Sequence, residues 1–357
     1  MHLSTALVTR LPAWKRPRLA VRLIAVAAAT LLLALPAAAA EPDDAFRQKL
    51  TTAVERGLPL VEQAAGRYPE HRKCFSCHHQ TLPMLAMVAA KNAGQKIDRK
   101  EFDAQKELTH TSFEYDLEDL RAGKGIGGKG LTVGYGLWTL GLGGQKPDEV
   151  TEAMVTYLLK TQEDDGRWDV HANRPPMEES ALTTTVLSII GLRKYAVDEQ
   201  RGDVEAAVSK AGAWIDSAET KSQEDLVAKL WGLHMLKRPA AAIDEARRAV
   251  LDAQREDGGW GQLESMPSDP YATGLTLCVL FMTGSTREEA ACRRGLEFLL
   301  DTQQEDGSWF VKTRSKPVQV YFDNGDPHGK DQFISTPAAC WSLVALSMGA
   351  RLPSEND

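Results

Sequence analysis

Three copies of one short segment determine the fold of this chain: Gln162-Glu-Asp-Asp165-Gly166-Arg-Trp168, Gln254-Arg-Glu-Asp257-Gly258-Gly-Trp260 and Gln303-Gln-Glu-Asp306-Gly307-Ser-Trp309. All three share the pattern Q-x-x-D-G-x-W. Each copy follows a stretch with the apolar spacing of an amphipathic helix and precedes a second, less charged helical stretch. The glycine suits a left-handed residue that ends the first helix. The expected repeating unit is therefore an outer helix, this turn, a loop and an inner helix.

The spacing of the copies predicts six such units. The first two copies lie 92 residues apart and the last two lie 49 residues apart, so one unit without the tryptophan turn is expected between the first two. Two further units precede the first copy. The expected outer and inner helices are 45–66 with 81–94, 101–121 with 131–142, 148–160 with 177–195, 204–216 with 223–236, 244–254 with 271–283, and 296–300 with 337–347.

The charge of the two kinds of helix favours a closed ring. Outer stretches such as 244–254 are amphipathic, whereas inner stretches such as 271–283 carry almost no charge. A helix that is apolar on all sides must be covered on all sides. Six inner helices surrounded by six outer helices satisfy this requirement. We therefore expect an all-α (α/α)6 toroid of twelve helices, with a central cavity lined by the ends of the inner helices.

Composition and the amino-terminal segment define the class of protein. The 357 residues are 43% hydrophobic and 25% charged, as in globular proteins. Residues 1–40 combine five basic residues, an apolar stretch over 23–36 and the sequence Ala38-x-Ala40, which predict a signal peptide, with an uncleaved anchor as the alternative. Without those five, 37 basic residues face 49 acidic ones, a net charge of −12 that argues against nucleic acid as a partner. We expect one toroid domain over 41–357, no membrane span within it, and a periplasmic or secreted location.

The repeated turns also resemble those of a known family. They are similar to the QW repeats of squalene and oxidosqualene cyclases and to the related turns of protein prenyltransferase β subunits. The resemblance covers about residues 45 to 350 and implies the (α/α)6 toroid that these proteins share. It is specific for the fold and weak for the reaction, because one toroid hosts many functions.

A second motif lies where the first hairpin would carry its turn. Lys73-Cys74-Phe75-Ser76-Cys77-His78-His79-Gln80 contains C-x-x-C-H. It resembles the motif of c-type cytochromes, which implies one haem c attached through Cys74 and Cys77, with His78 as a ligand of the iron. With the QW turns, it makes the chain similar to exported bacterial squalene-cyclase-like proteins that carry this motif. The alternatives are a redox or structural cysteine pair and a zinc site using His78 and His79. The other three cysteines lie singly in apolar stretches and are expected to be buried free thiols: Cys278, Cys292 and Cys340.

Closure of the ring predicts a neighbour for the cysteine turn. Hairpin six follows hairpin five and adjoins hairpin one, so the loop 308–330 should lie beside residues 74–80. This loop contains His328, which we expect to be a second iron ligand or a residue of the haem pocket. Met84 and Met87 are the alternative ligands, and an ordinary loop histidine is the simpler interpretation of His328.

Several acidic residues fall at the start of inner helices and are expected at one rim of the toroid. A carboxylic acid whose pKa is raised by an apolar cavity could protonate an alkene, and Asp269, Asp331 and Asp326 are the catalytic candidates. The simpler interpretation is that such acids cap helices. The D-x-D-D motif of class II cyclases is absent, and Asp269-Pro270-Tyr271 lacks the cysteine of the prenyltransferase zinc site. The full set at the rim is Glu178, Glu179, Glu224, Asp225, Asp269, Asp326 and Asp331.

These observations support one leading hypothesis and two alternatives. The leading hypothesis is an exported toroid with one covalent haem c that acts in redox chemistry or electron transfer at the toroid mouth, with a redox partner protein. The first alternative is a class II terpene-cyclase-like enzyme that cyclises or isomerises an apolar, terpenoid-like small molecule. The second is a non-catalytic toroid that binds a lipid or a peptide.

Overall fold

The computed structural model describes residues 42–170, 174–317 and 319–351. The predicted signal peptide, residues 1–40, lies outside the described residues. Where the chain is described, its regular structure is helical, and the extended pairing consists of a single bridge between Arg174 and Glu178. The predicted all-α toroid is therefore confirmed.

Each predicted hairpin is present, with one difference. The inner helices are α2 (Leu82–Asn92), α5 (Lys129–Leu142), α7 (Ala181–Tyr195), α9 (Gln223–Met235), α11 (Pro270–Met282) and α13 (Gln332–Ala350). The outer helices are α1 (Pro42–His71), α3 (Arg99–Tyr115), α4 (Leu117–Ala122), α6 (Glu149–Thr161), α8 (Arg201–Ser217), α10 (Ala240–Asp252) and α12 (Ala290–Thr302). The predicted outer helix 101–121 is two helices, because the backbone leaves the helical conformation at Asp116, with φ −94° and ψ 17°. Three short elements complete the described part: the π-helix η1 (Cys77–Thr81) and the 3-10 helices η2 (Asp198–Gln200) and η3 (Gly329–Asp331).

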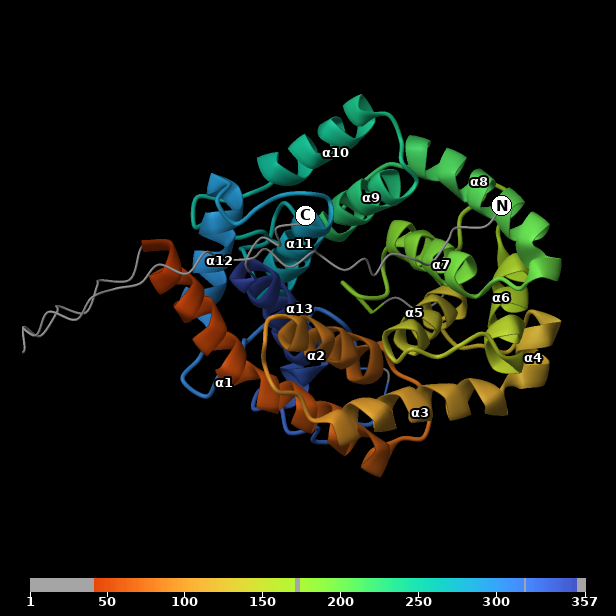
Figure 1. The fold of residues 1–357 in the computed structure, drawn as a ribbon, viewed down its shortest axis with the longest axis horizontal. Helices are drawn as coiled ribbons and strands as arrows, with labels where there is room; N and C mark the ends of the chain where they lie inside the picture. The colour runs from red at the N-terminus through yellow and green to blue at the C-terminus, as the bar shows by residue number, and fades with distance from the viewer. Residues whose placement is uncertain (1–41, 171–173, 318, 352–357) are drawn as a thin grey trace, which may run out of the picture. The chain divides into compact units, whose positions relative to one another are not determined.

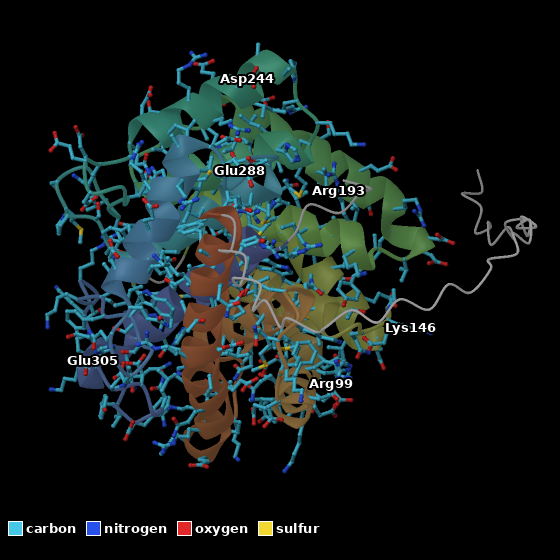
Figure 2. The ribbon with its side chains drawn as sticks, turned by 60° about the vertical axis from the view of Figure 1, so that its left-hand side comes forward. Arg99, Lys146, Arg193, Asp244, Glu288 and Glu305 are labelled. Carbon is cyan, nitrogen blue, oxygen red and sulfur yellow. The ribbon has the colours of Figure 1, made fainter. Side chains whose placement is uncertain are left out.

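The inner helices form a closed ring. Each of α2, α5, α7, α9 and α11 contacts the next inner helix in the chain, and α13 contacts both α11 and α2. The outer helices lie around this ring, with α1 between α3 and α12 (Figure 1). Charged residues on the outer side of the ring are exposed, including Asp244 on α10 and Glu288 and Glu305 in the segments before and after α12 (Figure 2). The ring closure brings the first hairpin against the last, as the sequence predicts.

The tryptophan turns join neighbouring outer helices. Trp168, Trp260 and Trp309 are fully buried, and each indole N–H donates a 2.8 Å hydrogen bond to a carbonyl of the outer helix that precedes it. The turn glutamines donate to a carbonyl of the next outer helix, and Gln303 thereby reaches Ala53 of α1 at 2.9 Å. The turn glycines have φ between 85° and 102°, so their predicted left-handed conformation is confirmed. Their predicted place at the helix end is wrong, because each outer helix ends before the turn and each glycine instead closes a tight turn through its own backbone N–H.

The apolar helices are core helices. One described helix, Gly329–Ala350, is long and apolar enough to cross a membrane, and 83% of its apolar window is buried inside the protein. It packs on α11 so closely that a Cβ on Gly274 would lie 2.7 Å from the backbone of α13. The three single cysteines are buried free thiols, as predicted: Cys278, Cys292 and Cys340.

Candidate functional site

The cysteine turn links α1 to the ring. Its backbone forms the π-helix η1, a rare conformation that is common at functional sites. Cys74 is exposed, Cys77 is half-buried, and both thiols are free. The Cys74 Sγ atom lies 3.4 Å from the hydroxyl of Tyr68, and the Cys77 Sγ atom lies 3.6 Å from Nδ1 of His78. Both thiols and the histidine of the motif therefore lie within one short turn.

The turn opens on the cavity at the mouth of the toroid. This mouth cavity has a volume of about 540 Å³, and His78 and His79 form part of its wall. The loop of hairpin six forms most of the rest, so the predicted meeting of the cysteine turn with that loop is confirmed. The lining is rich in cationic and in apolar or aromatic side chains: Arg174, Lys312, Lys316 and Lys330, and Pro317, Val320, Tyr321, Phe322 and Phe333.

His78 is held between the turn and α13. The ring centres of His78 and Phe333 lie 5.0 Å apart, edge to face. The Arg174 guanidinium lies 5.6 Å from the centre of the same Phe333 ring. Arg174 is fixed in turn by the buried carboxylate of Glu178, which accepts a 2.7 Å bond from its Nε. Burial lowers the pKa of His78 well below its usual range. The imidazole is therefore neutral at pH 7, the state in which histidine binds a metal.

His79 joins the turn to the last hairpin. It is buried, and its ring stacks on Tyr68 at 4.5 Å. The His79 Nδ1 atom lies 3.2 Å from the hydroxyl of Ser76, and Nε2 lies 3.1 Å from the side-chain nitrogen of Asn324. Burial lowers the pKa of His79 to about 3. His79 is therefore a neutral structural connection at the cavity wall.

His328 does not reach this cavity. Its Nε2 atom lies 3.0 Å from the hydroxyl of Ser308, and its ring packs on Phe310 at 5.2 Å. The alternative residues Met84 and Met87 are fully buried in the hydrophobic core, and neither lines the mouth cavity. The residue that the loop of hairpin six brings to the cysteine turn is Asn324. The expectation that His328 faces the iron pocket is therefore corrected, because its side chain turns back towards the start of its own loop.

The three acidic candidates have structural partners at separate positions. Asp269 is the N-cap of α11 and accepts a 2.9 Å bond from the backbone N–H of Ala272, while burial raises its pKa to about 6. Asp331 lines the mouth cavity and accepts bonds from the backbone of Thr313 and from Lys312. Asp326 accepts a 3.0 Å bond from the hydroxyl of Thr336. Asp269 therefore caps its helix, as the simpler interpretation expects, whereas Asp331 and Asp326 make no such cap and instead hold the loop 308–330 in place.

Another acid, Glu224, lies at the centre of the ring. It is buried, and its carboxyl accepts hydrogen bonds from the hydroxyls of Tyr271 at 2.8 Å and Thr183 at 3.2 Å. Burial raises the pKa of Glu224 to about 8. The carboxyl lines a small central cavity of about 20 Å³, whose other walls combine aliphatic side chains with four aromatic ones: Tyr135, Trp138, Trp231 and Trp341.

The sequence contains a signal for Glu224 that the acidic candidates lacked. Glu224, Val227, Ala228 and Trp231 have the spacing i, i+3, i+4, i+7, and all four line the central cavity. An acid at the start of that pattern lies on the same helix face as its apolar members. This spacing distinguishes Glu224 from the acids that cap the other inner helices.

The donor atoms of the cysteine turn suit a covalent haem better than a zinc ion. Within the described residues, no group of three or more His, Cys, Asp or Glu side chains has the arrangement of a metal site. A structural zinc ion needs four protein ligands. Haem attachment needs two free thiols and an adjoining histidine next to a space for the macrocycle. Cys74 and Cys77 supply free thiols, and of the three motif residues His78 is the one that lines the mouth cavity.

Comparison with known proteins gives local similarity in sequence. No family model matches the chain. The chain is 36% identical to a lanosterol synthase of Aspergillus fumigatus over 105 residues and 34% identical to a drimenyl diphosphate synthase of Streptomyces showdoensis over 81 residues. The matches cover 29% and 23% of this chain, but only 13% and 14% of those enzymes.

Comparison with solved structures gives similarity over most of the chain. A type II terpene cyclase from Scytonema, in complex with the product merosterolic acid A, matches with a TM-score of 0.54 and 14% identity, over 86% of this chain and 98% of the cyclase. A glycosidase matches with a TM-score of 0.52 and 12% identity, over 84% of this chain and 98% of its own. The chain therefore has the toroid fold of type II terpene cyclases, and that fold also carries unrelated chemistry.

Proposed function

We propose that this protein is an exported toroid that binds one c-type haem at its mouth and acts in electron transfer or redox chemistry there. The observation that carries the proposal is the position of the C-x-x-C-H turn, whose histidine forms part of the wall of a 540 Å³ cavity. Pockets for ligands of moderate size have volumes of roughly 300–1,000 Å³. Haem attachment outside the cytoplasm agrees with the predicted signal peptide.

The residues around the cavity suit each part of such a group. Cys74 and Cys77 offer thiols for thioether bonds, and His78 offers a neutral imidazole as an iron ligand. Phe322 and Phe333 supply apolar surface that excludes water. Carboxylates of the bound group are balanced by the cations in the lining: Arg174, Lys316 and Lys330. When bound, the haem supplies one-electron chemistry at its iron.

The test is covalent haem content. The full chain is expressed with haem-attachment machinery, and its pyridine haemochrome spectrum is recorded after acid-acetone extraction. We expect one haem per chain in the wild type and in Cys278→Ala, which removes a buried thiol distant from the motif. Cys74→Ala and Cys77→Ala should each lose at least one of the two thioether bonds, with a shifted haemochrome band. A wild-type chain that folds but retains no haem after extraction would overturn the proposal.

A second function rests on Glu224, and the sequence relatives favour it: the chain is similar to a lanosterol synthase and a drimenyl diphosphate synthase in sequence and to a type II terpene cyclase in fold. In this function the protonated Glu224 carboxyl gives its proton to an alkene of an apolar substrate, and aromatic faces stabilise the cation that forms. The central cavity of 20 Å³ holds no such substrate without rearrangement of its walls. A substrate would therefore require the walls of this cavity to move, although the comparisons favour this function over haem binding.

This second function has its own test. A related type II terpene cyclase is known in complex with geranylgeranyl dihydroxybenzoate, which makes that prenylated aromatic a suitable probe. Cyclised products are sought by mass spectrometry with the wild type and with Glu224→Gln, which keeps the hydrogen-bonding shape but donates no acidic proton. Product from the wild type that falls at least a hundredfold in Glu224→Gln would support the function. Equal product from both proteins, or none from either, would exclude Glu224 as the initiating acid for this probe.

A further inference from the structure

We infer that Asn324 is a positioning residue for the cysteine turn: it holds the C-x-x-C-H segment in place from the opposite end of the chain. This inference deepens the proposed haem site and rests on it for its function, although the contact itself is independent of any bound group. Asn324 lies 245 residues after His79 and is completely buried. The inner ring must close for the two side chains to meet.

The hydrogen bonds of Asn324 define the orientation of its amide. Its Oδ1 atom accepts a 3.0 Å bond from the backbone N–H of Asp326, so Oδ1 must face that donor. The side-chain nitrogen then faces two acceptors, Nε2 of His79 at 3.1 Å and the hydroxyl of Thr336 at 3.2 Å. Both amide hydrogens are used, and the reversed amide would lose these bonds. Asn324 is therefore a donor to His79.

This donor determines the tautomer of His79. Because Nε2 accepts a hydrogen bond, the proton of the neutral ring is on Nδ1, which donates to the Ser76 hydroxyl at 3.2 Å. Ser76 lies between the two cysteines of the motif. Its backbone N–H is also held, by Oε1 of Gln80 at 2.7 Å. Asn324 thus acts on the segment between the cysteines through one imidazole ring.

The His79 ring is also connected to two residues of the proposed haem site, Cys74 and His78. His79 stacks on Tyr68, whose hydroxyl lies 3.4 Å from the Cys74 sulfur. On its other side, the ring centre of His79 lies 4.6 Å from that of His78. A His79 ring free to rotate would release both contacts. Asn324 therefore fixes the relative positions of the first thiol and of the proposed iron ligand.

The principal test measures Cys77, the half-buried thiol of the motif, in the full chain expressed without haem-attachment machinery. In a Cys74→Ala background, the rate of Cys77 labelling by a thiol reagent is compared without further change, with Asn324→Ala and with Asn92→Ala, a matched control at an exposed asparagine of α2. We expect the rate to rise several-fold to about tenfold in Asn324→Ala, as follows from losing a buried hydrogen bond, and to stay unchanged in the control. An unchanged rate in a folded Asn324→Ala protein would overturn the inference.

A second measurement remains informative if Asn324→Ala folds poorly. In Asn324→Asp, a carboxylate oxygen replaces the donor that faces Nε2 of His79. We expect the side-chain ¹⁵N shifts to report a proton on Nδ1 in the wild type and on Nε2 in the variant. A wild-type ring with its proton on Nε2 would contradict the inference. Neither readout needs haem, so a chain without covalent haem would remove the proposed function and leave the positioning role to be judged separately.

Discussion

The ionisable residues inside the ring differ mainly in how completely they are buried and in what they contact. Asp331 is anchored at the edge by Lys312 and stays close to water, whereas Glu224 has only hydroxyl donors at the ring centre. Two hydroxyl bonds offset only part of the desolvation of a carboxylate. The pKa of Glu224 consequently rises to about 8, and the side chain is a neutral acid at pH 7. The raised pKa depends on the side chains that bury Glu224, and these come from several inner helices and form no short sequence motif.

The raised pKa of Glu224 predicts a pH-dependent stability. The folded protein holds this proton up to about pH 8, whereas the unfolded chain releases it near pH 4.5. The unfolded state therefore binds fewer protons in this window, and the free energy of unfolding falls as the pH rises from 4.5 to 8. For Glu224 this contribution is up to about 4 kcal/mol.

Glu224→Gln isolates the contribution of this residue. Asp269, with a pKa of about 6, acts in the same direction, so the difference between variant and wild type is the quantity to compare. Urea unfolding at pH 5 and pH 8 should show a smaller loss of stability in Glu224→Gln than in the wild type. Parallel losses in both proteins would mean that Glu224 is ionised in the folded state.

At the scale of the elements, the tryptophan turns connect one hairpin to the next. Each turn binds its own outer helix through the indole N–H and the following outer helix through the glutamine amide. In the third turn, the Trp309 ring contacts Gly57 of α1, where a Cβ would lie 2.8 Å from the indole. The turn of the last hairpin thus binds the first outer helix.

Gln303 and its neighbour Gln304 allow a controlled test of this connection. The Gln303 amide donates to the carbonyls of Ala53 at 2.9 Å and Gly307 at 3.0 Å, whereas the Gln304 side chain is exposed. Gln303→Ala should lower the free energy of unfolding by roughly 1–3 kcal/mol, because two buried carbonyls lose their donor. Gln304→Ala should change it by less than about 0.5 kcal/mol. Equal effects in chemical denaturation would show that the turn does not connect the helices energetically.

At the scale of the whole described ring, the first and last helices are tied together by Arg287. This buried guanidinium donates to the Asp43 carboxylate of α1 at 3.1 Å and to the carbonyls of Gly349 at 3.1 Å and Arg351 at 2.9 Å, at the end of α13. Arg287 lies in the segment before α12, so this one side chain links that segment to the outer helix α1 and to the end of the inner helix α13. Closure therefore depends on a charged connection as well as on apolar packing.

Removal of Arg287 should weaken the ring as a unit. Arg287→Ala leaves two carbonyls and one carboxylate without their donor, and we expect a loss of about 2–4 kcal/mol. Asp43→Asn keeps both carbonyl bonds and weakens only a pair that is open to solvent on one side, so it should cost less than about 1 kcal/mol. Denaturation monitored by tryptophan fluorescence and by circular dichroism measures both. A loss as large in Asp43→Asn as in Arg287→Ala would assign the stabilisation to the ion pair alone.

The sequence was sufficient for those features that depend on nearby residues. The Q-x-x-D-G-x-W turns bind their own outer helix ten residues back, so their pattern marks three of the hairpins, and their spacing together with the helical periodicity predicts the other three. The break at Asp116 was missed, because the apolar spacing continues across it. Ring closure also followed from the sequence, since uncharged inner helices need cover on every side.

The tertiary structure decided which side chains meet. Both His328 and Asn324 lie on the loop that reaches the cysteine turn, and sequence favoured the histidine as a metal ligand, yet the backbone directs Asn324 to His79 and His328 to Ser308. Likewise, the spacing along α9 places Glu224 on an apolar helix face, but only the fold brings aromatic side chains of other inner helices around it. Neighbouring residues determine local hydrogen bonds and helical periodicity, so the sequence predicts them. Burial and long-range contacts depend on how segments far apart in the sequence pack together, so only the tertiary structure decides them.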